Sequence, residues 1–336
     1  MTIHKDKTIL TGDRATGKLH LGHYAGSLMH RVQLQDDNNQ TILIADMQGL
    51  TDNGYEPEKV SSNILNVVAD YLSVGIDPNK TVICLQSALP ALAELTMLYS
   101  NLVTLSRLER NPTLSNEKKN KSYAENIPVG FLTYPISQAA DITAFKADLI
   151  PVGDDQLPMI EQSNEIVKKV NKITGKETLV KSTALLSSVS RLPSVDGKSK
   201  MSKSSGLVIN FDTSDKDIKK IVNKMYTDCN HLNIEDKGSI QGNVVFSYLD
   251  AFYNDKNHLK ALKEHYQKGG LADGITKSIL IECLIEMIRP IRKERELLMN
   301  DKAELINILK KGTEISRKIT QETCDRVKRD FGLLIF

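Results

Sequence analysis

Hydrophobic positions in the first half of the chain follow two alternating periods. Short apolar runs over Thr8–Thr11, Thr41–Ala45, Thr81–Leu85 and Ala147–Val152 are typical of buried parallel strands. Between them, longer segments repeat apolar residues about every 3.6 positions and predict amphipathic helices. These predicted helices cover Leu19–Gln35, Pro57–Val74, Leu89–Leu108 and Asp155–Val170. The alternation predicts an α/β fold in which helices wrap a doubly wound parallel sheet.

Beyond Asp212 the pattern becomes almost wholly helical. The predicted helices cover Asp215–Tyr226, Asn243–Phe252, Leu259–Gln267, Thr276–Met299, Lys302–Lys310 and Ile315–Phe331. Two segments carry few helix signals and are predicted as loops: the lysine-rich residues 109–128 and the proline- and serine-bearing residues 179–205. The pattern therefore predicts an α/β domain over residues 1–205 and a C-terminal all-helical domain over residues 206–336.

Composition narrows the class of protein. A chain of 336 residues suits roughly two domains. Its 44 basic and 42 acidic residues leave a net charge of only +2, so any binding of nucleic acid depends on local basic clusters. The polar N-terminus and the lack of a long apolar run predict a cytoplasmic protein with no membrane contact. The four cysteines form no C-x-x-C pair, which argues against a disulfide framework and a cysteine metal site.

The first chemical signal is the segment T-G-D-R-A-T-G-K-L-H-L-G-H over residues 11–23, where the first strand meets the first helix. His20 and His23 are three positions apart and can donate hydrogen bonds to phosphate oxygens from one helix face. Gly22 leaves room between them for an adenine or a ribose. Half of a metal site, or two surface histidines without a role, would be the simpler explanations of this segment alone.

The second signal is K-M-S-K-S over residues 200–204, within the second predicted loop. Lysines spaced along a loop can fold over a triphosphate and neutralise the charge that develops on pyrophosphate when the α-phosphorus is attacked. By itself, such a pentapeptide is as well explained by a solvated loop or a phosphorylation site.

In this order, the two segments resemble the signatures of class I aminoacyl-tRNA synthetases, which have a Rossmann-like catalytic domain. Nearly the whole chain is similar to the tryptophanyl-tRNA synthetases, especially the bacterial branch that reads G-D-R-x-T-G-K-L-H-x-G-H. The resemblance implies a ligase that activates tryptophan with ATP and Mg²⁺ and then transfers it to the 3′ end of tRNA(Trp). It also implies a homodimer.

The resemblance also implies roles for individual residues. Catalysis would depend on His20, His23, Lys200 and Lys203. ATP would be bound by Arg14, Ala15, Thr16, Gly22, His23, Gly153, Asp154, Asp155, Leu192, Lys200, Met201, Ser202, Lys203 and Ser204. Tryptophan would be bound by Tyr134, Gln138, Asp141 and Gln156, with Asp141 accepting a hydrogen bond from the indole N–H. No residue is assigned as a metal ligand.

Three alternatives remain at this point. A tyrosyl-tRNA synthetase shares the fold, and Gln138, which stands where many relatives have Met, would suit a phenol. A paralogue could bind nucleotide for regulation without charging tRNA. A nucleotidylyltransferase has a similar histidine motif, although such enzymes are usually shorter. The helical domain is expected to bind the anticodon through the basic stretches Lys219–Lys220, Arg289–Arg295 and Arg326–Arg329.

Overall fold

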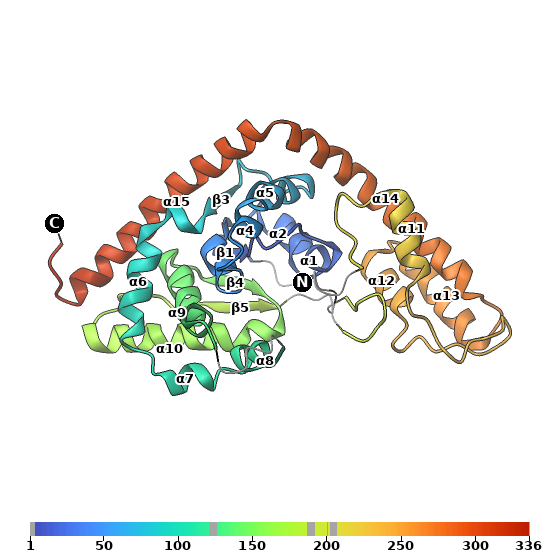
Figure 1. Cartoon of the computed structure of the whole chain (residues 1–336), viewed down its shortest axis with the longest axis horizontal. Helices are drawn as coiled ribbons and strands as arrows, with labels where there is room; N and C mark the ends of the chain where they lie inside the picture. Colours follow the sequence, from blue (N-terminus) through green and yellow to red (C-terminus); the bar gives the residue numbers. More distant parts are fainter. Residues whose placement is uncertain (1–3, 121–125, 187–191, 200, 202–206, 336) are drawn as a thin grey trace. The chain divides into compact units, whose positions relative to one another are not determined.

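The computed structural model describes residues 4–120, 126–186, 192–199, 201 and 207–335, and it contains two compact units (Figure 1). The sheet unit comprises Met1–Gly17, His30–Ser187 and Asp301–Phe336. The helical unit comprises Lys18–Met29 and Ser188–Asn300. Within the described ranges, no helix has the length and apolar character that a membrane span requires.

The sheet unit is built on a parallel sheet of five strands. The strands are β1(Thr8–Asp13), β2(Asn39–Ile44), β3(Thr81–Leu85), β4(Leu149–Val152) and β5(Thr183–Leu186), in the spatial order β3-β2-β1-β4-β5. The four predicted strands are confirmed. The predicted loop over residues 179–205 is wrong for β5, because the apolar run of this four-residue edge strand is very short and only partly buried.

Helices surround this sheet and confirm the predicted α/β class. They are α2(Met29–Leu34), α3(Asp46–Leu50), α4(Glu58–Ser61), α5(Ile64–Ser73), α6(Pro90–Ser100), α7(Leu105–Glu109), α8(Pro112–Asn120), α9(Val129–Ala144), α10(Leu157–Thr174) and α15(Lys302–Asp330). One core joins α6, α9 and α10 to the strands through Leu95, Ala139, Val167 and Leu43. The predicted loop over residues 109–128 is wrong for α8, whose polar sequence has no clear apolar stripe.

Helix α15 continues through the position where two helices were predicted, and that division is wrong. Gly312 lies inside it because the helix meets β3 there: a Cβ atom at this position would lie 2.0 Å from the carbonyl oxygen of Ile83. The adjacent Thr313 Oγ1 accepts a hydrogen bond from the backbone N–H of Leu85 at 3.1 Å. The helix therefore covers the open edge of β3, an edge that would otherwise expose unpaired backbone groups.

The helical unit contains the rest of the described helices. They are α1(Leu21–His23), the π-helical turn η1(Tyr24–Leu28), α11(Asp215–Asn223), α12(Val244–Phe252), α13(Lys256–Lys268) and α14(Asp273–Asn300). The helices predicted between residues 215 and 299 are confirmed, with ends that differ by a few residues. The compact units divide the chain differently from residues 1–205 and 206–336, since α15 packs with the sheet. The functional division at residue 205 stays a prediction.

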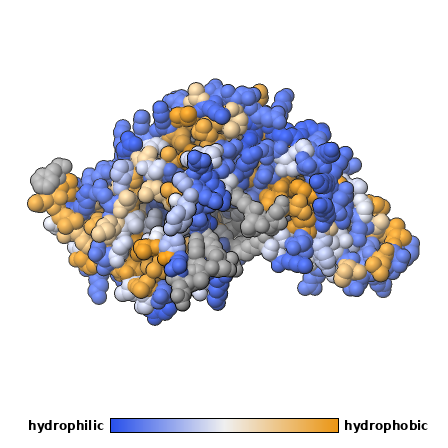
Figure 2. All heavy atoms as spheres, in the orientation of Figure 1, coloured by the Kyte–Doolittle hydropathy of each residue, from blue (hydrophilic) through white to orange (hydrophobic). Residues whose placement is uncertain are grey.

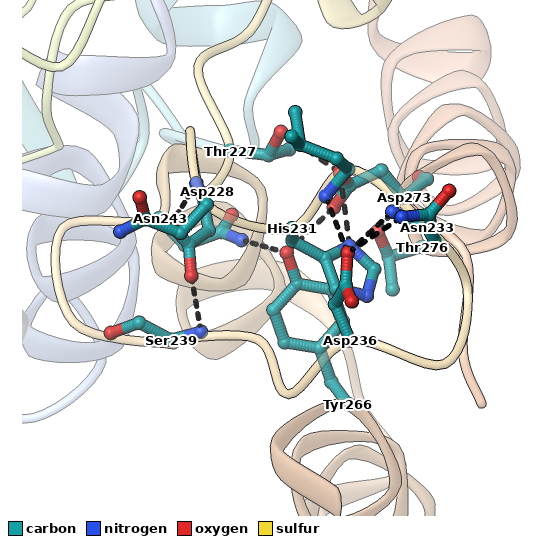
Figure 3. Close-up of polar contacts among 12 residues, drawn as sticks. Thr227, Asp228, His231, Asn233, Asp236, Ser239, Asn243, Tyr266, Asp273 and Thr276 are labelled. Atoms are coloured by element: carbon teal, nitrogen blue, oxygen red, sulfur yellow. Dashed lines mark hydrogen bonds and ion pairs between the residues drawn. The ribbon is translucent and has the colours of Figure 1, made fainter. Parts of the chain in front are cut away.

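A polar cluster fastens the connection between α11 and α12 to α13 and α14 (Figure 3). Asp273 Oδ1 accepts a hydrogen bond from the hydroxyl of Tyr266 at 2.7 Å. Its Oδ2 accepts one from Thr227 Oγ1 at 3.2 Å and contacts His231 Nδ1 at 3.4 Å. The same connection is braced internally, because Asp228 Oδ2 accepts the backbone N–H of Ser239 at 2.7 Å. Asp273 thus joins three segments of the helical unit.

Replacing Asp273 with Ala is expected to lower the free energy of unfolding by about 2–4 kcal/mol, because buried donors lose a charged acceptor. Asp250→Ala is the matched control. Asp250 is exposed. Among the ion pairs of the described residues, it takes part only in the one with Lys263, at 2.5 Å. Loss of this surface pair should cost less than about 1 kcal/mol. Urea unfolding followed by circular dichroism measures the free energy of unfolding of both variants. Equal losses for the two variants would mean that the cluster adds no more than a surface ion pair.

Candidate active site

The sheet order creates a switch point between β1 and β4, which are neighbours in space but not in sequence. Ligands of open α/β sheets bind at the carboxyl ends of the strands beside such a point. Strand β1 ends at Asp13 and leads directly into residues 14–16, whereas β4 ends at Val152 and leads into residues 153–156. The structure therefore brings two of the predicted ATP-binding segments to the same edge of the sheet.

A buried ion pair between Asp13 and Arg31, which was not predicted from the sequence, supports the turn after β1. Asp13 Oδ2 accepts hydrogen bonds from Arg31 at 2.6 Å and from the hydroxyl of Tyr71 at 2.8 Å. Arg31 is 2 % exposed, so this guanidinium is an internal support and not a ligand for solvent anions. The next residue, Arg14, pairs with Asp52 at 2.6 Å. The beginning of the turn is consequently tied to α2, to α5 and to the residues after α3.

The remainder of this turn is partly or fully buried, whereas the turn after β4 is more open. Ala15 is fully buried and Thr16 is half-buried, with its backbone N–H donating to Arg14 O at 2.8 Å. After Gly153, Asp154 and Asp155 are exposed in the short 3-10 turn η3(Asp154–Gln156). These carboxylates can accept hydrogen bonds from hydroxyl groups such as those of a ribose.

Three of the four residues predicted to bind the amino-acid substrate lie on one face of helix α9. Tyr134, Gln138 and Asp141 follow one another at intervals of four and three, which places their side chains in a row. Gln138 Nε2 donates to Gln156 Oε1 at 3.4 Å, so α9 meets the turn after β4 at this point. Burial, and next the Glu117 carboxylate, raise the pKa of Tyr134, which therefore stays a neutral phenol. All four predicted tryptophan-binding residues thus belong to the sheet unit.

Asp141 is the most buried of these groups, at 4 % exposure. Burial raises the pKa of its carboxyl to about 7, and a hydrogen bond from Gln86 opposes this rise. Gln86 Nε2 lies 3.1 Å from Oδ1 and 2.9 Å from Oδ2, while Gln48 Nε2 donates to Oδ2 at 2.6 Å. Neither glutamine was among the residues predicted from the sequence. The available signal was their position, since Gln48 follows the end of β2 and Gln86 follows the end of β3.

In the helical unit, His20 and His23 form a reciprocal cap at the start of α1. His20 Nδ1 accepts the backbone N–H of Gly22 at 3.1 Å, and His23 Nδ1 accepts that of His20 at 3.2 Å. A nitrogen that accepts a hydrogen bond carries no proton, so each neutral ring has its proton on Nε2. The ring centroids are 3.9 Å apart. Both rings can therefore donate from Nε2 toward a phosphate oxygen.

The segments around the second signature contact this cap within the helical unit. Met201 Sδ would lie 3.5 Å from a Cβ atom on Gly22, and the Met201 N–H donates to Leu192 O at 3.0 Å. Further along, Ile209 O accepts the backbone N–H of Leu21 at 3.0 Å. The two signatures, far apart in sequence, are therefore neighbours. Lys200, Ser202, Lys203 and Ser204 lie outside the described residues.

Comparison with known proteins agrees with this geometry. The model of the family "tRNA synthetases class I (W and Y)" matches residues 2–288. The chain belongs to this family, the class I synthetases of tryptophan and tyrosine, and the Rossmann-like fold predicted from the sequence is confirmed.

Individual proteins similar to this chain include several that are named for tryptophan. The tryptophan–tRNA ligase of Clostridium longisporum is 52% identical over 98% of this chain and 97% of its own length. That of Streptococcus mutans is 50% identical over 98% of both chains. The crystal structure of the Campylobacter jejuni tryptophanyl-tRNA synthetase, complexed with ADP and tryptophan, is 31% identical with a TM-score of 0.83. It covers 97% of this chain and 100% of its own.

Proposed function

We propose that the chain is a tryptophan–tRNA ligase, which joins tryptophan and ATP into tryptophanyl-adenylate and then charges tRNA(Trp). The observation that carries this proposal is the buried Asp141 carboxylate on the ligand face of α9. Indole offers one N–H donor and no acceptor, so an acceptor-only group is its complement. Relatives from Clostridium longisporum, Streptococcus mutans and Streptococcus agalactiae, at about half identity, are named tryptophan–tRNA ligases, which favours tryptophan over tyrosine.

In the first step, the tryptophan carboxylate attacks the α-phosphorus of ATP and pyrophosphate leaves. The attacking carboxylate is already ionised, so the step needs no general base and depends on positioning and charge. Tyr134, Gln138 and Gln156 would hold the amino acid, with the α-ammonium near Tyr134 and Gln156. The residues after β1 and β4, Arg14–Thr16 and Gly153–Asp155, would hold the nucleoside and ribose.

Phosphate charge would be met by residues of the two signature segments. His20 and His23 would donate from Nε2, Gly22 would pack on the nucleoside, and Leu192 and Met201 would complete the contact with ATP. Lys200 and Lys203, with Ser202 and Ser204, would bind the departing pyrophosphate. Among the described residues no group of three or more His, Cys, Asp or Glu could hold a metal ion. We propose, from the family resemblance, that Mg²⁺ accompanies the ATP phosphates.

In the second step, the 2′-OH of the terminal tRNA adenosine attacks the adenylate carbonyl, the ester bond to tRNA forms, and AMP leaves. We propose that residues 206–336 bind the anticodon, but not through the whole of the basic stretch on α14. Arg289 and Arg292 each pair with Asp215 at 2.7 Å, so these two cations serve the fold. Lys219 and Lys220 are exposed on α11 and are better placed to meet RNA.

We also propose a homodimer. Apolar side chains reach the surface in several places (Figure 2), and in the sheet unit they include Met47, Tyr55, Met97 and Val129. Large exposed apolar groups of this kind are favourable at an interface between subunits. Light scattering at micromolar concentration would measure the mass directly, and a mass near 37 kDa would contradict this part of the proposal.

ATP–pyrophosphate exchange with each of the twenty amino acids tests the substrate. We expect exchange with tryptophan, ATP and Mg²⁺, and none above background with phenylalanine. Exchange with tyrosine but not tryptophan would overturn the substrate assignment, and no exchange with any amino acid would favour the paralogue.

Binding can be observed separately from catalysis, because the chain contains no tryptophan. Indole emission therefore comes from the substrate alone, and the protein contributes only its 10 tyrosines. We expect bound tryptophan to emit at shorter wavelength than free tryptophan, since its ring leaves water for a less polar site. An emission spectrum that does not change on addition of excess protein would contradict a buried indole site.

A further inference from the structure

The Asp141 carboxylate is held by two side-chain amides that follow two different strands of the sheet. Gln48 lies on α3, directly after β2, and donates to Oδ2 at 2.6 Å. Gln86 begins the turn after β3 and donates to both oxygens, at 3.1 and 2.9 Å. Gln86 is itself 3 % exposed, so these contacts are shielded from water and are strong for neutral donors.

The two amides are also fixed with respect to each other. Gln86 Oε1 accepts the backbone N–H of Gln48 at 3.1 Å, so its Nε2 must point toward Asp141. Next to this contact, Asp46 Oδ1 accepts the backbone N–H of Ser87 at 2.9 Å, which ties α3 to the turn after β3. The direction of the Gln86 amide is therefore determined by the backbone and not by the carboxylate alone.

Among the residues that the structure describes, no cation contacts this carboxylate. The pKa of Asp141 is raised by burial and lowered only by Gln86, without a contribution from a neighbouring charge. Cys84 on β3 is a titratable neighbour of Asp141. Burial raises the pKa of the Cys84 thiol to about 12, so the thiol remains neutral. A lysine or arginine would satisfy the carboxylate completely, whereas two neutral donors leave it with unmet acceptor capacity.

We propose that Gln48 and Gln86 are positioning residues that set amino-acid specificity, by holding Asp141 as an oriented anion that still requires one N–H donor from the substrate. This inference rests on the proposed function. Tryptophan supplies the required donor. Phenylalanine supplies none, so its binding would leave the buried acceptor incompletely paired, and that mismatch is the basis of strong discrimination.

The test compares Gln48→Met and Gln86→Met with a control, Gln40→Met. Gln40 is an equally buried glutamine on β2, but its amide donates to Arg31 O at 3.1 Å and Thr81 Oγ1 at 3.0 Å, away from Asp141. Each variant loses one side-chain amide, which is buried in Gln86 and Gln40 and partly buried in Gln48. For each protein, tryptophan affinity is measured from indole fluorescence, and kcat and KM from pyrophosphate exchange, between pH 5.5 and 9.

For Gln86→Met we expect KM for tryptophan to rise about 10–100-fold, the effect of one hydrogen bond to a charged group, with a much smaller change in kcat. Removal of this donor should also move the acidic limb of kcat/KM to higher pH, because the carboxylate loses a contact that favours its ionised form. Gln48→Met should change in the same direction. Gln40→Met should lose stability but keep the pH profile of the wild type.

The outcomes separate the two proposals. Failure of the wild type to bind or activate tryptophan would overturn the proposed function. An active wild type with both variants keeping its KM and pH profile, or a control that shifts equally, would overturn the role of the two glutamines while leaving the function intact.

Discussion

Replacing Asp141 with Asn is expected to lower kcat/KM for tryptophan by about 100-fold or more, because a charged acceptor is exchanged for a neutral one. The new amide group would also have to face the donors of Gln48 or Gln86, which now lie within 3.1 Å of the carboxylate. Activation of phenylalanine should fall much less, since phenylalanine does not use the acceptor. The ratio of the two kcat/KM values is therefore the informative measurement.

The same substitution should stabilise the folded protein at alkaline pH. The folded-state pKa of Asp141, about 7, lies above the ordinary value of 3.8, so the folded protein retains a proton that the unfolded chain releases. The contribution of Asp141 to the free energy of unfolding is thus largest below about pH 4. It declines as the pH rises to about 7, by roughly 4 kcal/mol in total. Asparagine cannot ionise and should remove this decline.

We therefore expect Asp141→Asn to melt at higher temperature than the wild type at pH 8, with no such advantage at pH 4. Asp154→Asn is the control, because this exposed carboxylate should leave both melting temperatures nearly unchanged. An unchanged tryptophan-to-phenylalanine ratio would place Asp141 outside the side-chain pocket. A melting temperature with the same pH dependence as the wild type would contradict the raised pKa.

Replacing His20 with Asn is expected to lower kcat by about 10²–10³-fold while leaving the fold stable. Asparagine is a good N-cap residue and can replace His20 Nδ1 as the acceptor for the Gly22 N–H. It has no donor at the position of Nε2, where the proposed contact to phosphate is made. The expected effect is larger on kcat than on the KM for ATP, because charge on the phosphates increases in the transition state.

His20→Ala separates the two roles of this residue. It removes both the cap and the donor, so kcat should fall as in the asparagine variant, and the free energy of unfolding should fall by about 1 kcal/mol more. Single-turnover formation of the adenylate and thermal unfolding measure the two effects. If His20→Asn retained full activity, the histidine would serve only to cap α1, and phosphate binding would have to be assigned elsewhere.

The local sequence pattern was sufficient to predict much of the fold and part of the candidate site. The apolar run Thr41–Ala45 and its counterparts identified strands β1 to β4, because a strand buried on both faces must be continuously apolar. The two signature segments likewise pointed to His20, His23 and the residues after β1. In each case the physical requirement acts on residues that are adjacent in sequence, so it is visible in the sequence itself.

Other features depend on contacts between residues far apart in sequence, and only the tertiary structure showed them. Gly312 suggests a helix end when read locally, but it lies within α15 because only glycine allows this helix to approach the Ile83 carbonyl on β3. Gln48 and Gln86 stand 93 and 55 residues from Asp141, and no periodicity relates such positions. Their meeting follows from the parallel sheet, which collects the carboxyl ends of β2 and β3 at one edge. The sequence thus predicted Asp141 as the acceptor for the indole N–H, and this role stays a prediction. Its two neutral donors, Gln48 and Gln86, became visible only in the tertiary structure.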